Sequence, residues 1–258
     1  FPYGRLLSGV LLFALLFPFF YLGQGGSGTS EAPAPTLFFS LILACIIPIF
    51  SFITAKLQEA LVELKPNLDL DDQSFEKVLV KLHSVSPVLI VVYLLAGALA
   101  GFAHMSFIRG SISGFAESLL TITGFMSGFG TLLVWIAMTS VVAMLIRQAR
   151  LFADLGAHKI RVSLLDTHKL SPFARVSIST SLFLIGALAF TPLISLKSGF
   201  NLAESAPGVI AGAVPLVALF FIPVWPIHRR LVQMKAQELA IINERIAGSQ
   251  NAAGEVDV

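Results

Sequence analysis

Residues 36–55 read TLFFSLILACIIPIFSFITA, a run of 20 residues without a charged side chain. An α-helix of that length rises about 30 Å, which matches the hydrocarbon core of a bilayer. Lipid offers the backbone no hydrogen-bonding partner, so a segment that crosses it must satisfy its own amide and carbonyl groups. The run therefore predicts a transmembrane helix.

The rest of the 258-residue chain has the same character. Hydrophobic residues make up 56% of it, charged residues only 12%, and Phe occurs 22 times. A soluble domain carries about 25% charged residues, because it needs them to cover its surface in water. The composition therefore excludes an ordinary cytosolic enzyme, a disordered chain and a disulfide-rich secreted domain. Cys45 is the only cysteine, so no intramolecular disulfide and no cysteine-based metal motif can form.

We predict an all-α fold, a bundle of six transmembrane helices with short amphipathic cytoplasmic helices. The expected membrane domain is 1–226, and 227–258 is expected to be a cytoplasmic polar helix with a disordered end. The first span could instead be a signal peptide, but no clear cleavage site follows the span. The six spans are 6–22, 36–55, 87–104, 119–146, 173–196 and 207–226.

The basic residues predict the orientation. Of the 17 Lys and Arg residues, all but Arg109 and Lys197 precede the first span or lie in the connections 56–85 and 147–175 and the C-terminal tail. Cytoplasmic connections carry the excess of basic residues in membrane proteins. We therefore expect a bacterial inner-membrane protein with its N- and C-termini in the cytoplasm.

Regular spacings suggest three related helical hairpins. Pro2, Pro87 and Pro172 are 85 residues apart and each begins an odd-numbered span. In two cases a serine precedes the proline, a pair that suits a helix start with serine as the cap. Three acidic residues outside the even-numbered spans repeat at 86 and 87 residues, namely Glu31, Glu117 and Glu204. The alternative is coincidence, because any six evenly spaced helices form three hairpins.

Small residues predict where helices approach closely. Three Gly-x-x-x-Gly pairs lie in the spans: Gly97 and Gly101, Gly124 and Gly128, and Gly208 and Gly212. Such pairs allow the backbones of two helices to come together. Packing within one chain is the simpler interpretation, and homo-oligomerisation or docking onto a larger membrane complex is the alternative.

Two amphipathic segments follow the second span. Residues 56–65 place leucines on one face and glutamates on another, Pro66 ends that helix, and a second short helix is expected over 73–83. The segments 162–175 and 225–231 resemble juxtamembrane parts of uncharacterised bacterial multi-pass inner-membrane proteins. This resemblance implies a bacterial origin and transfers no activity or functional residue.

The polar side chains on the cytoplasmic side form the only candidate site. They are His83, Asp166, His168, Arg175 and His228. Their convergence would bind a metal, whereas histidines that bind helix ends or lipid headgroups explain them equally well. No pair has metal-ligand spacing, and the sequence contains no nucleophile elbow or phosphate-binding loop. We therefore expect no catalytic residue, metal or cofactor.

Three functions remain open at this point. The favoured one is a non-enzymatic sensory, regulatory or accessory subunit whose cytoplasmic helices contact partners. The others are a transporter or channel for a neutral or lipidic substrate, and a membrane enzyme with a cytoplasmic-face His/Asp site. The expected surroundings are the lipid bilayer, and the net charge of +2 does not suggest nucleic acid.

Overall fold

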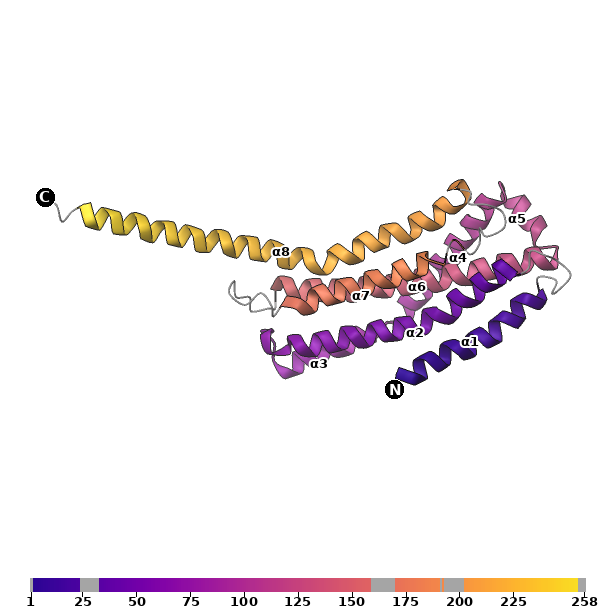
Figure 1. Cartoon of the computed structure of the whole chain (residues 1–258), viewed down its shortest axis with the longest axis horizontal. Helices are drawn as coiled ribbons and strands as arrows, with labels where there is room; N and C mark the ends of the chain where they lie inside the picture. The colour runs from indigo at the N-terminus through magenta and orange to yellow at the C-terminus, as the bar shows by residue number, and fades with distance from the viewer. Residues whose placement is uncertain (1, 24–32, 159–169, 191, 193–201, 255–258) are drawn as a thin grey trace.

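The computed structural model describes residues 2–23, 33–158, 170–190, 192 and 202–254, and these residues form helices and no strand. Figure 1 shows the helices side by side in one elongated bundle, with α8 extending well beyond the others. Their bounds are α1 Pro2–Gly23, α2 Pro33–Leu64, the short 3₁₀ helix η2 Lys65–Asn67, α3 Asp72–His83, α4 Pro87–Ile108, α5 Ile112–Ser118, α6 Ile122–His158, α7 Ser171–Leu188 and α8 Leu202–Gly254.

Six of these helices are long and apolar enough to cross a membrane. They are α1, α2, α4, α6, α7 and α8, and each coincides with all or most of one of the six predicted spans. Two limits differ from the prediction. Helix α6 begins at Ile122 instead of 119, because the Thr121 hydroxyl accepts a hydrogen bond from the Gly124 amide at 3.1 Å and caps the helix. Helix α7 ends at Leu188 instead of 196.

The predicted cytoplasmic helices are also present, although the first is not separate. Residues 56–65 continue α2 without a break up to Leu64, and Pro66 lies in η2. The second helix is α3, whose N-cap Asp71 accepts a hydrogen bond from the Ser74 amide at 3.3 Å. The Ser74 side chain and, to a smaller extent, this amide stabilise the carboxylate by hydrogen bonding and hold the pKa of Asp71 below its ordinary value of 3.8. The predicted boundary at 226 falls inside α8, which has no break there.

Of the two Ser-Pro helix starts, only one is built as predicted. Ser86 caps α4 and its hydroxyl accepts a hydrogen bond from the Leu89 amide at 3.3 Å. Ser171 does not cap α7, because that helix already begins at Ser171 and its N-cap is Leu170. Pro172 still occupies the first turn, where its missing N–H breaks no hydrogen bond.

Each predicted hairpin forms a packed pair: α1 with α2, α4 with α6, and α7 with α8. Contacts between the pairs are unequal in the described part of the chain. Helix α2 packs along α7, whereas α8 has no comparable contact with α4. A threefold axis would make these two contacts equivalent. A common origin of the hairpins therefore stays a prediction.

The largest hydrophobic cluster lies at the end of the bundle that contains α3. Its fully buried members include Leu57, Leu61 and Leu64 of α2 and Phe152 of α6, all of them outside the predicted spans. By contrast, α1 and α4 expose most of their leucines and valines. This division fits a bundle with one end in water, where burial is favourable, and a flank in lipid, where an exposed apolar side chain costs nothing.

Candidate functional site at the basic end of the bundle

The connections predicted to be cytoplasmic gather at one end of the bundle. Figure 1 places α3, the start of α7 and the bend of α8 at this end, and α5 at the opposite end. Described basic residues of α3, the end of α6, the start of α7 and the bend of α8 therefore lie at the end that holds the large hydrophobic cluster, which we call the basic end.

Two side chains of α6 hold the C-terminus of α3. Arg147 Nη2 donates to the carbonyl oxygen of Lys81 at 3.0 Å, and Gln148 Nε2 lies 3.4 Å from the carbonyl oxygen of Leu82. These carbonyls belong to the last turn of α3, where the helix itself supplies no donor. Gln148 is 4% exposed and also approaches the Thr54 hydroxyl of α2 at 3.5 Å. The three helices are thus joined at one point.

Two further arginines join helices at this end. Arg230 of α8 donates to the carbonyl oxygen of Ala157 in the last turn of α6 at 3.3 Å. Arg175 of α7 forms an ion pair with Glu63 of α2 at 2.9 Å, and both side chains are about half exposed. The charge bias of the sequence indicates both arginines, but nothing in the sequence identifies Ala157 or Glu63 as their partners.

The predicted polar cluster does not assemble among the residues that the structure describes. His83 Nδ1 lies 3.1 Å from the carbonyl oxygen of Leu79, one turn earlier in α3. The ring of His228 lies beside Trp225 of its own helix, with centroids 6.4 Å apart. Arg175 is bound to Glu63 as described above.

Asp166 and His168, the other two members, lie outside the described residues. Within the described ranges no three His, Cys, Asp or Glu side chains form a group that could hold a metal ion. His83 and His228 therefore contact groups of their own helices.

An apolar groove of about 320 Å³ runs between the start of α7 and α8. Two of its lining residues, Ser171 and His228, carry polar side chains, and the rest are apolar or aromatic. Such a lining suits an apolar ligand with one polar group. The lining residues are Leu170, Ser171, Phe173, Ala174, Val224, Ile227, His228 and Leu231.

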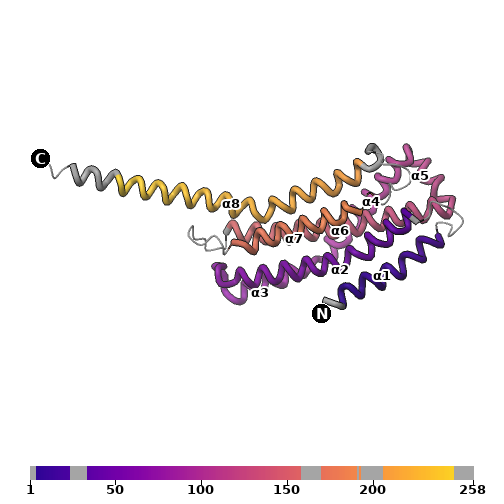
Figure 2. The backbone as a smooth tube through the Cα atoms, in the orientation of Figure 1, coloured from indigo at the N-terminus to yellow at the C-terminus, as the bar shows by residue number. Residues whose placement is uncertain are grey.

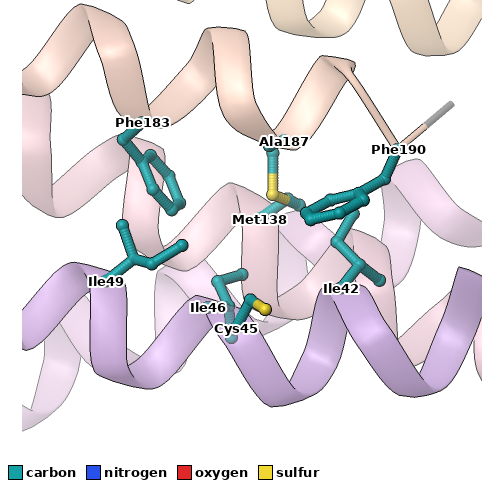
Figure 3. A pocket seen from close by; sticks show the side chains of 8 residues that line it. All are labelled: Ile42, Cys45, Ile46, Ile49, Met138, Phe183, Ala187 and Phe190. Atoms are coloured by element: carbon teal, nitrogen blue, oxygen red, sulfur yellow. The ribbon is translucent and has the colours of Figure 1, made fainter. Parts of the chain in front are cut away.

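The interior between α2, α6 and α7 is closely packed. A small space of about 10 Å³ lies there, enough for at most a single water molecule. Figure 3 shows the apolar side chains that surround it, with Cys45 of α2 among them. The lining residues are Ile42, Cys45, Ile46, Ile49, Met138, Phe183, Ala187 and Phe190.

Gly97 and Gly101 lie where α4 meets α6. A Cβ atom on Gly97 would stand 2.5 Å from the Cα atom of Ile136, and one on Gly101 would stand 3.2 Å from side-chain atoms of Leu132 and Trp135. Backbone atoms cannot move aside as a side chain can. Gly97 is therefore the tightest of these helix contacts.

The second glycine pair has different neighbours. A Cβ atom on Gly124 would clash with the carbonyl oxygen of Ser118, so this glycine serves the turn between α5 and α6 instead of a contact between long helices. Gly128 faces the side chains of Leu119 and Phe115 at 3.3 and 3.4 Å. The pair accommodates α5 and the turn that follows it.

In the third pair only Gly212 makes a close contact. A Cβ atom there would stand 2.5 Å from a side-chain atom of Leu188 in α7. Gly208 differs, because no atom of the described chain lies within 4 Å of its Cβ position. The sequence pattern alone does not distinguish these two positions.

The distal part of α8, predicted to be a polar helix, also exposes apolar side chains. Residues 232–246 form what we call the α8 arm, the part of α8 beyond its last groove residue, Leu231. The arm exposes Val232, Leu239, Ile242 and Ile246 by about half each. The regular spacing of these four residues in the sequence could have indicated this row of apolar side chains.

No protein-family model matches the chain, and neither the curated proteins nor the solved structures contain a match to it.

Proposed function

We propose that the protein is a non-enzymatic, multi-pass protein of the bacterial inner membrane. As a subunit, it contacts a partner through the α8 arm. Its role would be sensory, regulatory or accessory. The observation that carries the proposal is the continuation of α8 past the bundle (Figure 2), with apolar side chains exposed along the arm. A soluble helix that presents a row of apolar side chains to water generally has a binding role.

The rest of the basic end is built to hold this arm in place. Arg230 ties α8 to the end of α6 immediately before the arm begins. Ile227, one turn before Leu231, is 5% exposed and belongs to the large hydrophobic cluster. The arm therefore projects from a firm base, which reduces the entropy lost when a partner binds.

Substitution of the exposed apolar residues tests this role without truncating the chain. In the Leu239→Gln/Ile242→Gln variant, binding of the partner should weaken about tenfold or more, because buried apolar anchors dominate such interfaces. Native mass spectrometry of the full chain released from its own membrane would measure species heavier than the 27.7 kDa chain. The matched control is Gln237→Ala/Glu244→Ala, on the opposite face. Equal assemblies for all three proteins would contradict the proposed role.

The proposed orientation places both termini and the arm in the cytoplasm. A membrane-impermeant thiol reagent applied to intact cells should label Ser113→Cys of α5 and leave Gln237→Cys of the arm unlabelled, each in a Cys45→Ser background. Both positions are exposed, so accessibility differs only through the membrane. The reverse labelling pattern would invert the topology.

The groove between α7 and α8 favours a second candidate, the handling of a lipidic or neutral apolar ligand. Its apolar lining and its place at the end of two predicted spans are the specific observations. Trp225, exposed beside the groove, would report such a ligand through its fluorescence in a Trp135→Phe background.

A further inference from the structure

Four of the five exposed large hydrophobic residues of the arm follow a heptad pattern. Val232, Leu239 and Ile246 are seven residues apart, and Ile242 follows Leu239 by three. In a coiled coil these are three successive a positions and one d position, and Lys235 occupies the other d position. The four side chains form a stripe and are exposed by 54%, 50%, 50% and 48% in that order. The fifth residue, Ile241, is 44% exposed and lies outside the stripe at a c position.

No described part of the same chain covers this stripe over residues 232–242. In Figure 1 the arm continues past the ends of the other helices and away from the bundle. Gln237 and Glu244 lie at f positions on the opposite face, which a coiled coil leaves in water. An occupant of the stripe must therefore come from another molecule.

The charges of the arm select among possible occupants. Lys235 and Arg245 balance Glu238 and Glu244, so the arm is neutral overall. An anionic lipid surface or a strongly charged protein gains no electrostatic attraction from a neutral arm. A second neutral arm meets no repulsion between net charges, only the local repulsion between the two Lys235 side chains, and its heptad positions match those of the stripe.

We infer that the stripe is the seam of a parallel, two-stranded coiled coil between the arms of two copies of this protein, an inference that rests on the proposed role of the arm. Two copies in one membrane have the same orientation, so their arms leave it in the same direction and at the same height. Each a residue then meets its own counterpart across a twofold axis.

The polar residues at the edge of this seam are compatible with the pairing. Glu238 at a g position faces Asn243 at the e position of the other copy, so no like charges meet there. Lys235 meets its counterpart in the seam, and its long side chain can direct the ammonium group to water. A single lysine in a seam fixes the register at a cost in stability.

Disulfide cross-linking in the native membrane tests the inference with the full chain. Ile242→Cys and Glu244→Cys are compared, each in a Cys45→Ser background that removes the only native thiol. The d positions of a parallel pair bring Cβ atoms within disulfide range, whereas f positions lie on the outer surfaces. Mild oxidation should therefore give a species of twice the chain mass about ten times faster from Ile242→Cys than from Glu244→Cys.

Addition of Lys235→Leu to the Ile242→Cys protein should raise the yield, because it removes the repulsion in the seam. Addition of Leu239→Asp should abolish the cross-link. Equal rates at positions 242 and 244, or no dimer from either, would overturn self-association. Cross-linking of Ile242→Cys to a different polypeptide would overturn it while retaining the proposed role of the arm. A native mass spectrum that shows the single chain alone would overturn both.

Discussion

Replacement of Gly97 by leucine should push α4 away from α6 and lower the free energy of unfolding by about 3 kcal/mol, the upper part of the usual range for overpacking. The reason is geometric. The first side-chain atom already meets the Ile136 Cα atom at 2.5 Å and the Trp135 carbonyl oxygen at 3.0 Å, so relief requires movement of the helix axis. Helix α4 has no other long helix with comparable contact in the described chain, so it would detach rather than shift onto a second support.

Thermal unfolding in detergent, followed by Trp135 fluorescence, measures this effect. A loss of about 3 kcal/mol corresponds to a decrease in Tm of about 6–12 °C for a chain of this size. Gly208→Leu is the matched control, because nothing in the described chain lies within 4 Å of its Cβ position. A Tm for Gly97→Leu equal to that of Gly208→Leu would show that α4 and α6 do not approach each other as closely as this.

Truncation of Phe152 to alanine should cost about 3–5 kcal/mol of stability, the usual range for a fully buried aromatic side chain. Phe152 is 0% exposed, and its ring meets that of Phe173 edge to face, with centroids 6.1 Å apart and an angle of 88° between the rings. The change would leave a cavity between α6 and α7 at the basic end. In the proposed orientation this end lies in water, so the hydrophobic contribution applies in full.

Chemical denaturation monitored by circular dichroism would give the difference in unfolding free energy. Phe221→Ala removes the same atoms from a ring that is 51% exposed and serves as the control. Similar losses for the two variants would mean that burial at the basic end does not distinguish Phe152, and the packing described for α6 and α7 would be incorrect.

The long helices could be predicted because their cause is local. A run such as 36–55 is apolar throughout, and backbone groups in lipid can only be satisfied within the segment itself. The same holds for α3, whose acidic start and amphipathic pattern lie within 12 residues. The exact starts of two helices were nevertheless not predicted, because they are set by the residues that precede each helix. Thr121 as the cap of α6 and Leu170 as the cap of α7 depend on the chain path before each helix.

The candidate site was less predictable, because its partners are backbone atoms far apart in sequence. Arg147 and Arg230 were recognisable only as part of a charge bias, whereas their acceptors are the carbonyl oxygens of Lys81 and Ala157. Every residue has a backbone carbonyl group, so no pattern of side chains identifies which carbonyl will accept a hydrogen bond from an arginine. For the predicted polar cluster, the described members His83 and His228 contact groups of their own helices, and a shared side of the membrane, as predicted, does not by itself bring side chains together.

The sequence by itself determined the helical class, the number of apolar helices and the gathering of basic residues at one end, since composition and period act within each segment. The tertiary structure alone decided which glycine meets a backbone, Gly97 and not Gly208, because that depends on which faces of two helices touch. It also decided that Ile227 is buried and Ile242 exposed on the same helix. The physical reason is that the bundle ends before α8 does, and a sequence pattern contains no information about where neighbouring helices stop.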